Sequence, residues 1–278
     1  RYDINGNSWT TMANFPGSPD KAGALVYDGG NYIYTFDGGS IDFYRYNIAT
    51  NTWSQRADYY DKFDAGGSLT TDGIYIYAFQ GKGSNRFERY NPSTNSWSTM
   101  ASAPGNINTG GALTFGGTYI YALQGAGTGF YRYNIASNSW TTLTNTPGTV
   151  GQGGGLTFDG SNIYAFQGNN TTNFWRWNIA SGTWTTSLTN APGTVGGGGD
   201  LVAAVTSRAA SSSSAIFTQT LPMASSFAMP VGGLITVTTY ISATPSTNTV
   251  ISSISQSSDD AEQEGPEGVS PGTVHTSS

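Results

Sequence analysis

Residues 43–53 read FYRYNIATNTW, and this stretch recurs along the chain with few changes. It returns as FERYNPSTNSW at 87–97, as FYRYNIASNSW at 130–140 and as FWRWNIASGTW at 174–184, and a shortened copy, RYDINGNSW, opens the chain at 1–9. The arginines of successive copies are 44, 44, 43 and 44 residues apart. A fixed period of this length indicates that one structural unit is repeated.

Two further elements keep the same period. The motif Ile-Tyr-x-Phe/Leu-x-Gly occurs at 33–38, 76–81, 120–125 and 163–168. Glycines open each unit, at Gly23, Gly66–Gly67, Gly110–Gly111, Gly153–Gly155 and Gly196–Gly199. Because three elements share one register, chance is a poor explanation, and the chain contains a tandem repeat of about 44 residues.

Each unit is predicted to form four short antiparallel strands. The first follows the glycines, as at 24–27, and an Asp-Gly or Gly-Gly pair then supplies the positive φ of a tight turn. The Ile-Tyr motif forms the second strand, segments such as 43–47 form the third, and the fourth starts at the Trp. Because Asn alternates with Gly two residues before that Trp, a left-handed backbone is expected there. The positions are Asn7, Asn51, Asn95, Asn138 and Gly182.

Four-stranded units at this period favour a β-propeller over a solenoid. They resemble repeats of the kelch (galactose oxidase-like) family, in the type found in bacterial and archaeal surface proteins. The shared features are the Ile-Tyr-x-Phe-x-Gly strand, the Arg-Tyr-Asn strand, the Asn-Ser/Thr-Trp ending and a Pro-Gly at 16–17, 104–105, 147–148 and 192–193. The resemblance covers residues 1 to about 206 and implies an all-β, kelch-like β-propeller. The chain departs from the family where the double glycine survives only at Gly38–Gly39 and where residues 58–64 replace a Pro-Gly loop.

Four units are complete, at 23–57, 66–101, 110–145 and 153–188. Residues 1–12 supply only the two outer strands of another unit, and we expect its inner strand at Asp200–Thr206 and its second strand at Ala215–Leu221. The two ends would then close a ring of about five four-stranded blades, which removes exposed edge strands. Two alternatives stay open: the half-units pair between neighbouring subunits, or further blades precede residue 1.

The composition changes after the repeats. We divide the chain into a propeller at 1–207, a β-rich extension at 208–257 and a flexible acidic tail at 258–278. The extension carries no repeat marker, and about 50 residues of strand are too few for an independent domain. It is expected to pack on the propeller or to begin a truncated β-sandwich, or else to add strands to the sheet edge of a neighbouring subunit.

The composition also limits the partners of this chain. Only 10% of the residues are charged, 13% are aromatic, and the net charge is -6. Such a chain lacks the Lys and Arg needed to neutralise nucleic-acid phosphates or anionic lipid, and no apolar run is long enough to predict a membrane span. The charge-poor surface, rich in Ser, Thr, Asn and Gly, is more typical of extracellular or cell-surface β-proteins.

Groups suited to catalysis are scarce. The only histidine is His275 in the tail, and there is no cysteine, so the propeller holds no Ser-His-Asp triad, histidine metal site or thiolate. The family resemblance raises the copper centre of galactose oxidase, which needs His and a Cys-linked Tyr; this propeller has neither. We therefore expect no enzyme activity and no cofactor. Asp58, Asp61 and Asp64 cluster in the irregular loop and form a weak candidate Ca²⁺ site.

Arginines and tryptophans recur once per unit, and we interpret them as structural, with arginines stacked on aromatic rings and tryptophans anchoring blade contacts. They are Arg45, Arg89, Arg132, Arg176, Trp53, Trp97, Trp140 and Trp184. An anion-binding ring of arginines and sugar-stacking tryptophans are the alternatives. Trp175 stands where other units have Tyr or Glu, and with Trp177 it is a candidate ligand-binding residue. Asn169 and Asn170 begin overlapping Asn-x-Thr sequons and are candidate glycosylation sites.

These observations favour a non-catalytic structural propeller of the extracellular space or cell surface, which self-associates through its terminal strands into a filament or surface layer. The alternative is a lectin- or adhesin-like module that binds glycans or a protein through loop aromatics and amides. A hydrolase or lyase that uses carboxylates is a third class. Nucleic-acid binding and membrane insertion are not expected.

Overall fold

The computed structural model describes most of the repeat region and three strands beyond it. The described residues are 1–3, 5–17, 24–197, 199–202, 217–219, 234–244 and 247–257. The acidic tail expected at 258–278 lies outside them, as does His275. None of the described residues belongs to a helix that could cross a membrane.

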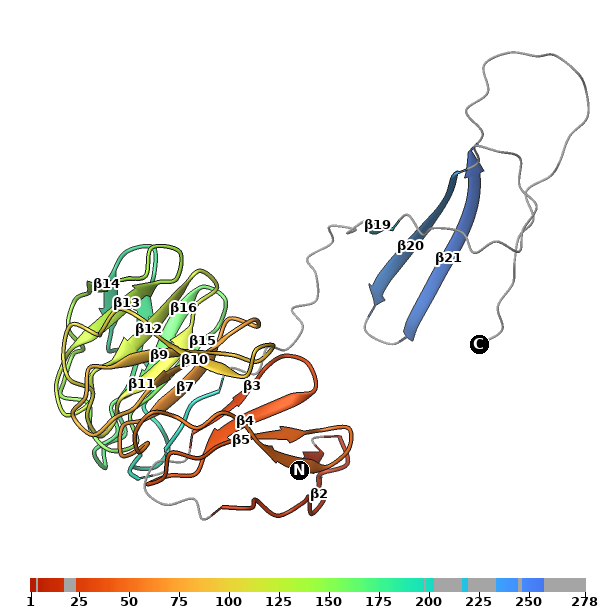
Figure 1. Cartoon of the computed structure of the whole chain (residues 1–278). Helices are drawn as coiled ribbons and strands as arrows, with labels where there is room; N and C mark the ends of the chain where they lie inside the picture. Colours follow the sequence, from red (N-terminus) through yellow and green to blue (C-terminus); the bar gives the residue numbers. More distant parts are fainter. Residues whose placement is uncertain are drawn as a thin grey trace, which may run out of the picture. The chain divides into compact units, whose positions relative to one another are not determined.

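The chain divides into two compact units, Arg1–Ala204 and Val205–Ser278 (Figure 1). The division falls three residues before the boundary that we expected after residue 207. The second unit contains one three-stranded antiparallel sheet in the order β19-β20-β21. Its strands are β19 (Phe217–Gln219), β20 (Leu234–Thr244) and β21 (Thr247–Ser257).

The first unit contains four antiparallel sheets of four strands each, and within every sheet the strands follow one another in chain order. Each sheet matches one sequence repeat and forms one blade of a β-propeller. Blade 1 has β3 (Leu25–Tyr27), β4 (Tyr32–Phe36), β5 (Phe43–Asn47) and β6 (Thr52–Gln55); blade 2 has β7 (Ser68–Thr71), β8 (Ile76–Phe79), β9 (Phe87–Asn91) and β10 (Ser96–Thr99). Blade 3 has β11 (Ala112–Phe115), β12 (Tyr119–Leu123), β13 (Phe130–Asn134) and β14 (Ser139–Thr142); blade 4 has β15 (Gly155–Phe158), β16 (Asn162–Phe166), β17 (Phe174–Asn178) and β18 (Thr183–Thr185).

Each end of the repeat region supplies part of a fifth blade. The inner strands β3, β7, β11 and β15 lie next to one another in that order, and Gly199–Val202 lies beside β15 and lines the same central channel. At the other end, β1 (Tyr2–Asp3) and β2 (Ser8–Trp9) form a hairpin that precedes blade 1. The expected all-β, five-bladed propeller is therefore confirmed.

One strand assignment was wrong. Residues 215–221 were expected to form the second strand of the fifth blade, but Phe217–Gln219 pairs with β20 in the second unit. The reason is the strand that follows in the sequence: β20 reads LITVTTYISAT, an uncharged and strongly β-prone run that pairs with all three residues of β19. Residues 203–206 of the expected inner strand lie outside the described residues.

The glycine runs are explained by close contacts between blades. Gly66 has a φ of +86°, and a Cβ on it would collide with the carbonyl oxygen of Asn108 in the loop that enters the next blade. Gly110 meets Gly151 in the same way one blade later. Because only glycine accepts both the positive φ and this close approach, glycine is required before the inner strands of blades 2 to 4.

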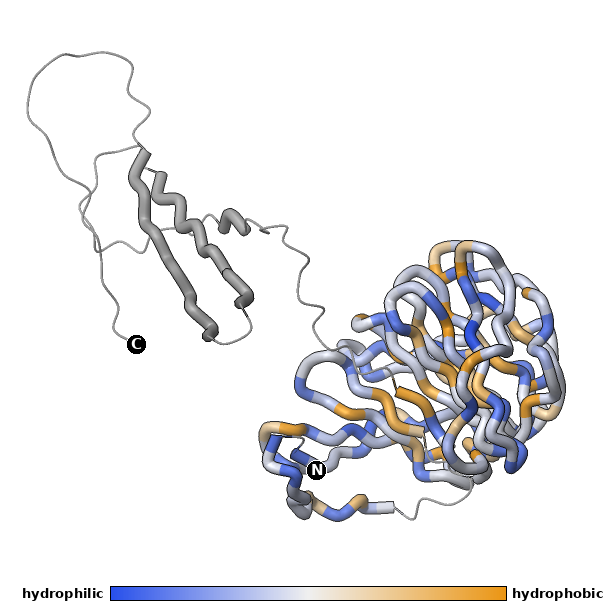
Figure 2. Tube along the Cα trace, turned by 180° about the vertical axis from the view of Figure 1, so that it is seen from behind, coloured by the Kyte–Doolittle hydropathy of each residue, from blue (hydrophilic) through white to orange (hydrophobic). Residues whose placement is uncertain are grey.

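The hydrophobic core is divided into three clusters, and each lies between two neighbouring blades. At each of these boundaries a Phe from the third strand of one blade packs against two aromatic rings of the next. Ring centres of Phe43 lie 5.0 Å from Tyr90 and Trp97, those of Phe87 lie 4.8 and 5.0 Å from Tyr133 and Trp140, and those of Phe130 lie 5.2 and 4.8 Å from Trp177 and Trp184. Figure 2 shows that apolar and polar residues alternate along the chain of the propeller.

A second contact, which we call the Trp–Asn clamp, joins the blades at their outer strands. The peptide of Ala57, which follows blade 1, accepts a 3.0 Å hydrogen bond from Trp97 Nε1 at its carbonyl and donates a 2.9 Å bond from its N–H to Asn95 Oδ1. The Tyr90 hydroxyl donates to the same Asn95 oxygen over 2.7 Å. Equivalent clamps hold Ala13 against blade 1 and Ala101 against blade 3.

The asparagines of the clamp have the left-handed backbone that the sequence predicted. Asn7, Asn51, Asn95 and Asn138 have φ between 45° and 55°, and Gly182 has a φ of +66°. In blade 4 two residues change together, because Trp177 replaces the tyrosine and Gly182 replaces the asparagine. The Trp177 ring lies near the space where a side chain at position 182 would start. Only the indole bond is kept there, from Trp184 to the Thr144 carbonyl over 3.1 Å.

The clamp asparagine accepts hydrogen bonds and also adopts a left-handed backbone. We predict that Asn95→Ala and Asn95→Gly separate the contributions of these two roles to stability. Asn95→Gly keeps the left-handed backbone but loses two hydrogen bonds, which costs about 1–2 kcal/mol of unfolding free energy. Asn95→Ala adds the penalty for a Cβ in that conformation, for a total of about 2–4 kcal/mol. Urea unfolding followed by tryptophan fluorescence measures both. Equal losses in the two variants would show that backbone strain plays no part.

Candidate functional site

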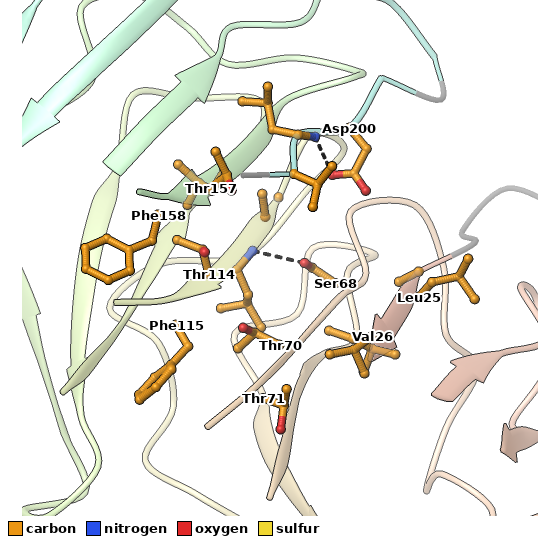
Figure 3. Close-up of a pocket in the computed structure, with 18 of the residues that line it drawn as sticks. Leu25, Val26, Ser68, Thr70, Thr71, Thr114, Phe115, Thr157, Phe158 and Asp200 are labelled. Atoms are coloured by element: carbon orange, nitrogen blue, oxygen red, sulfur yellow. Dashed lines mark hydrogen bonds between the residues drawn. The ribbon is translucent and has the colours of Figure 1, made fainter. Parts of the chain in front are cut away.

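The propeller has a central channel with a volume of about 460 Å³. The inner strands of the four complete blades and Gly199–Val202 surround it (Figure 3). Hydroxyl groups of Ser68, Thr70 and Thr114 are among its lining groups. The Ser68 hydroxyl also accepts a 3.0 Å hydrogen bond from the Leu113 N–H, which ties the inner strands of blades 2 and 3 together.

Among the described lining residues, Asp200 carries the single carboxylate. It is exposed, and its Oδ1 accepts a 2.7 Å hydrogen bond from the N–H of Leu201. The channel therefore combines hydroxyls, backbone groups of inner strands and one negative charge. Groups of this kind can hydrogen-bond a polar, hydroxyl-rich ligand, whereas the carboxylate chemistry of glycoside hydrolysis uses two acids in one site.

The prediction that Trp175 and Trp177 form a ligand-stacking surface is wrong. Their side chains are only 4% and 3% exposed. Both belong to the core cluster between blades 3 and 4, where Trp177 packs 5.3 Å from Trp184. A β-strand alternates its side chains between two faces, and in a propeller blade both faces are covered by neighbouring blades, so a larger ring at these positions fills the core.

The candidate Ca²⁺ site at Asp58, Asp61 and Asp64 is also not supported. Within the described part of the chain, no three or more His, Cys, Asp or Glu side chains converge as metal ligands. Asp58 accepts from Gln55, Asp61 from the Lys62 N–H and the Gln80 amide, and Asp64 from the Ala65 N–H. These hydrogen bonds, that of the Lys62 backbone above all, hold the pKa of Asp61 below its usual range. The three carboxylates therefore shape the loop separately.

The repeated arginines stack on tyrosines inside their own blades. The guanidinium carbons of Arg45, Arg89 and Arg132 lie 4.1, 4.3 and 4.4 Å from the ring centres of Tyr32, Tyr75 and Tyr119. This is the contact expected of a structural arginine. Blade 4 has Asn162 in place of that tyrosine, and Arg176 there pairs across the strands with Tyr164.

The candidate glycosylation residues lie on an exposed turn. Asn169 and Asn170 both have a φ of 56°, and both are exposed in the loop between the second and third strands of blade 4. The Asn170 N–H donates to the Val195 carbonyl over 2.9 Å, and the Thr171 hydroxyl donates to the Gly168 carbonyl over 2.8 Å. The backbone of this turn is thus fixed while the two amide side chains stand on the surface.

One charged cluster was missed by sequence reasoning. Glu88 is 2% exposed, and its carboxylate pairs with Arg86. The Arg86 guanidinium also stacks 3.4 Å from the ring centre of Tyr60 in the irregular loop. The available signal was Glu88 itself, because the other complete units have an aromatic residue at this strand position. Neutralisation by Arg86 allows this carboxylate to be buried, so the cluster fixes the loop 58–64 against blade 2.

Comparison with known proteins supports the assignment of the fold. No protein-family profile and no curated protein sequence matches the chain. Among solved structures, YjhT superposes with a TM-score of 0.53 at 14% identity, covering 65% of this chain and 69% of its own. A protein of unknown function from Bacteroides thetaiotaomicron VPI-5482 gives a TM-score of 0.51 at 15% identity, and the match spans 72% of this chain and 57% of that protein. Both likenesses show a propeller-like β fold.

The buried tyrosines should make the stability of the fold depend on pH in the alkaline range. Tyr59 is 2% exposed and its hydroxyl has no hydrogen-bond partner among the described residues. Burial, with a smaller effect of the Glu88 carboxylate, raises its pKa far above its usual range. Burial likewise raises the pKa of Tyr34, Tyr77 and Tyr121. The folded chain thus holds these protons more tightly than the unfolded chain, whose tyrosines titrate near pH 10.

We therefore expect the melting temperature to be independent of these groups below about pH 10 and to fall as the pH rises above it. Tyr59→Phe should reduce that fall and leave the stability at pH 7 equal or higher, because it removes a buried hydroxyl that has no partner. Tyr60→Phe, at a side chain that is 54% exposed, is the matched control. A Tyr59→Phe variant that loses stability at pH 7 would contradict this account.

Proposed function

We propose that this chain is a non-catalytic structural propeller of the extracellular space or cell surface, which self-associates into a filament or surface layer. One observation carries the proposal: the fifth blade is unfinished in the described residues. Its outer hairpin is an isolated two-stranded sheet, β1-β2, and Gly199–Val202 contributes no paired strand. Unpaired strand edges are templates for pairing with another chain.

The second unit offers another such edge. In the order β19-β20-β21, one edge of β21 has no partner among the described strands. This strand reads TNTVISSISQS, with no charged residue and no proline in 11 residues. Proteins that stay monomeric commonly protect their edge strands with charges or prolines. An unprotected edge of this length supports pairing between copies.

Several properties support a kelch-type propeller at the cell surface. The repeat motifs fit the kelch pattern, and the blades have its four-stranded meander. The propeller sequence has no histidine or cysteine, which removes the commonest nucleophile–base pairs. The exposed Asn169 and Asn170 would be accessible to a glycosylating enzyme in an exported chain.

Self-association is tested by sedimentation velocity over a hundredfold range of concentration, together with negative-stain electron microscopy. We expect the mean sedimentation coefficient to rise with concentration and to end in regular polymers. A single monomeric species throughout that range would overturn the proposal. Added Ca²⁺ or EDTA should change neither result, because the carboxylates of 58–64 do not converge.

The channel favours a second candidate, a glycan- or protein-binding module. Its hydroxyls and Asp200 suit a polar ligand, whereas the tryptophans first considered for that role are buried. If the channel binds glycans, a glycan-array hit of the wild type should weaken about tenfold or more in Asp200→Asn, which removes the charge and keeps the shape. Thr10→Ala, outside the channel lining, is the control. No binding by the wild type to any glycan on the array would argue against this candidate.

A further inference from the structure

We infer that the β1-β2 hairpin of one copy docks on the open face of blade 4 of a second copy, with Trp9 as its central contact. This interface rests on the self-association proposed above and specifies the surfaces that form it. Both surfaces are described in the structure, and each lacks the partner that its equivalents have at the other blade boundaries.

The donor surface is the hairpin. Trp9 is 80% exposed and Tyr2 is 43% exposed, although the equivalent rings in blades 1 to 3 are buried or half-buried. The rings of Tyr2 and Trp9 are nevertheless arranged like the equivalent Tyr–Trp pairs inside the propeller. Its ring centres are 5.1 Å apart with an interplanar angle of 46°, against 5.1 Å and 48° for Tyr90 and Trp97.

The hairpin also holds its half of a Trp–Asn clamp. Asn7 has the left-handed backbone of the clamp asparagines, with φ 45°, and its amide oxygen accepts from the Tyr2 hydroxyl as Asn95 accepts from Tyr90. In the complete clamps, the asparagine and tryptophan bind the peptide of the residue four positions after the Trp of the preceding blade. Such a peptide is the missing partner of Asn7 and Trp9.

The acceptor surface is the open face of blade 4, on the side opposite blade 3. Phe174 occupies the position of Phe43, Phe87 and Phe130, which are 0% exposed and pack on two aromatic rings of the next blade. Phe174 is only half-buried, and the aromatic rings near it, Tyr164 and Phe166, come from its own blade. The face therefore lacks the Tyr and Trp that a following blade supplies.

The matching peptide is also available. Leu188 stands four residues after Trp184, as Ala57 stands four residues after Trp53. Its N–H and carbonyl have no hydrogen-bond partner among the described residues. Phe174 can thus pack against the rings of Tyr2 and Trp9. The backbone of Leu188 can bind the Asn7 amide oxygen and the Trp9 indole N–H, as in a complete clamp.

A second copy is the occupant that fits these observations. The chain's own hairpin is tied to blade 1, because Ala13 is clamped by Asn51 and Trp53 and the Phe15 ring lies 5.0 Å from that of Trp53. In this position Trp9 remains exposed, so its own blade 4 does not cover it. A donor at one end and an acceptor at the other form a heterologous contact, which repeats from copy to copy.

The interface is tested by complementation of two variants in the full chain. Trp9→Ala removes the donor and keeps the acceptor, whereas Phe174→Glu places a charge on the acceptor and keeps the donor. We expect each variant alone to associate about 30-fold or more weakly than the wild type in sedimentation equilibrium, as for a central aromatic anchor. Their equimolar mixture should form a one-to-one dimer that grows no further.

Controls separate docking from misfolding. Asn7→Gly keeps the left-handed backbone and removes the amide acceptor, so it should weaken association by less than Trp9→Ala. Leu188→Pro removes the N–H that Asn7 would bind and should behave as an acceptor variant. Ile74→Ala, at an apolar side chain of blade 2 that is 70% exposed, should leave association unchanged. Unchanged circular dichroism and melting temperature in each variant show that the propeller is intact.

Three results would overturn the inference in distinguishable ways. If the wild type associates and Trp9→Ala and Phe174→Glu associate equally well, self-association stands but this interface is wrong. If the variants are monomeric and their mixture forms no dimer, the hairpin does not bind blade 4 of another copy. If the wild type is monomeric at every concentration, the proposed function fails together with the interface.

Discussion

The propeller depends on the backbone of one residue after an outer strand, whose N–H and carbonyl are bound by the Trp–Asn clamp of the next blade; at blade 4 only the carbonyl is bound. Trp97 and Asn95 satisfy both the carbonyl and the N–H of Ala57, which would otherwise lie at a blade boundary without regular strand pairing. The clamp also fixes the Trp97 ring against Phe43, so one hydrogen-bonding arrangement and one aromatic contact define the boundary together. Strand lengths and turns vary between blades, but the combination recurs at blade 3, and blade 4 keeps its indole hydrogen bond and its aromatic contact.

Because these contacts join only neighbouring blades, the molecule behaves as a short array whose two ends differ. Among the described residues, Leu188 and Phe174 of blade 4 have no partner from a following blade, and Asn7 and Trp9 of the N-terminal hairpin have none from a preceding one. The same rule that stabilises the interior thus leaves two complementary surfaces. In a repeat protein such terminal surfaces need a cap, a ring closure or another molecule. The structural role proposed for this chain follows from these incomplete ends and does not depend on the channel.

The architecture could be predicted from the sequence because the residues that recur in every repeat are those that particular backbone conformations require. The left-handed asparagines, the Asp-Gly turns and the glycines at the inner strands are demanded by φ angles and close contacts, and they were visible because the same residue types recur at one position of every unit. Contacts between units could not be predicted in this way. The aromatic neighbour of Phe43 is Trp97, in the next repeat, and no feature within one unit identifies that pair.

The same limit explains the errors at the candidate sites. Trp175 differs from its counterparts in type, and this suggested exposure, but its environment is set by blade 3. Asp58, Asp61 and Asp64 are close in sequence, yet each carboxylate turns toward a different backbone or amide donor. Proximity along a loop gives no information on side-chain direction, and a metal site depends on direction.

The paired change of Trp177 and Gly182 has a consequence for how such an array can evolve. Blades 1 to 3 share one interface chemistry, so duplication or loss of one of these repeats would join surfaces that already match. Blade 4 has an indole and a glycine in place of the tyrosine–asparagine pair, and restoring either residue alone would not restore the hydrogen bond between the tyrosine hydroxyl and the asparagine amide. The two substitutions are therefore expected to be epistatic, and they distinguish the boundary of blade 4 from those of blades 1 to 3.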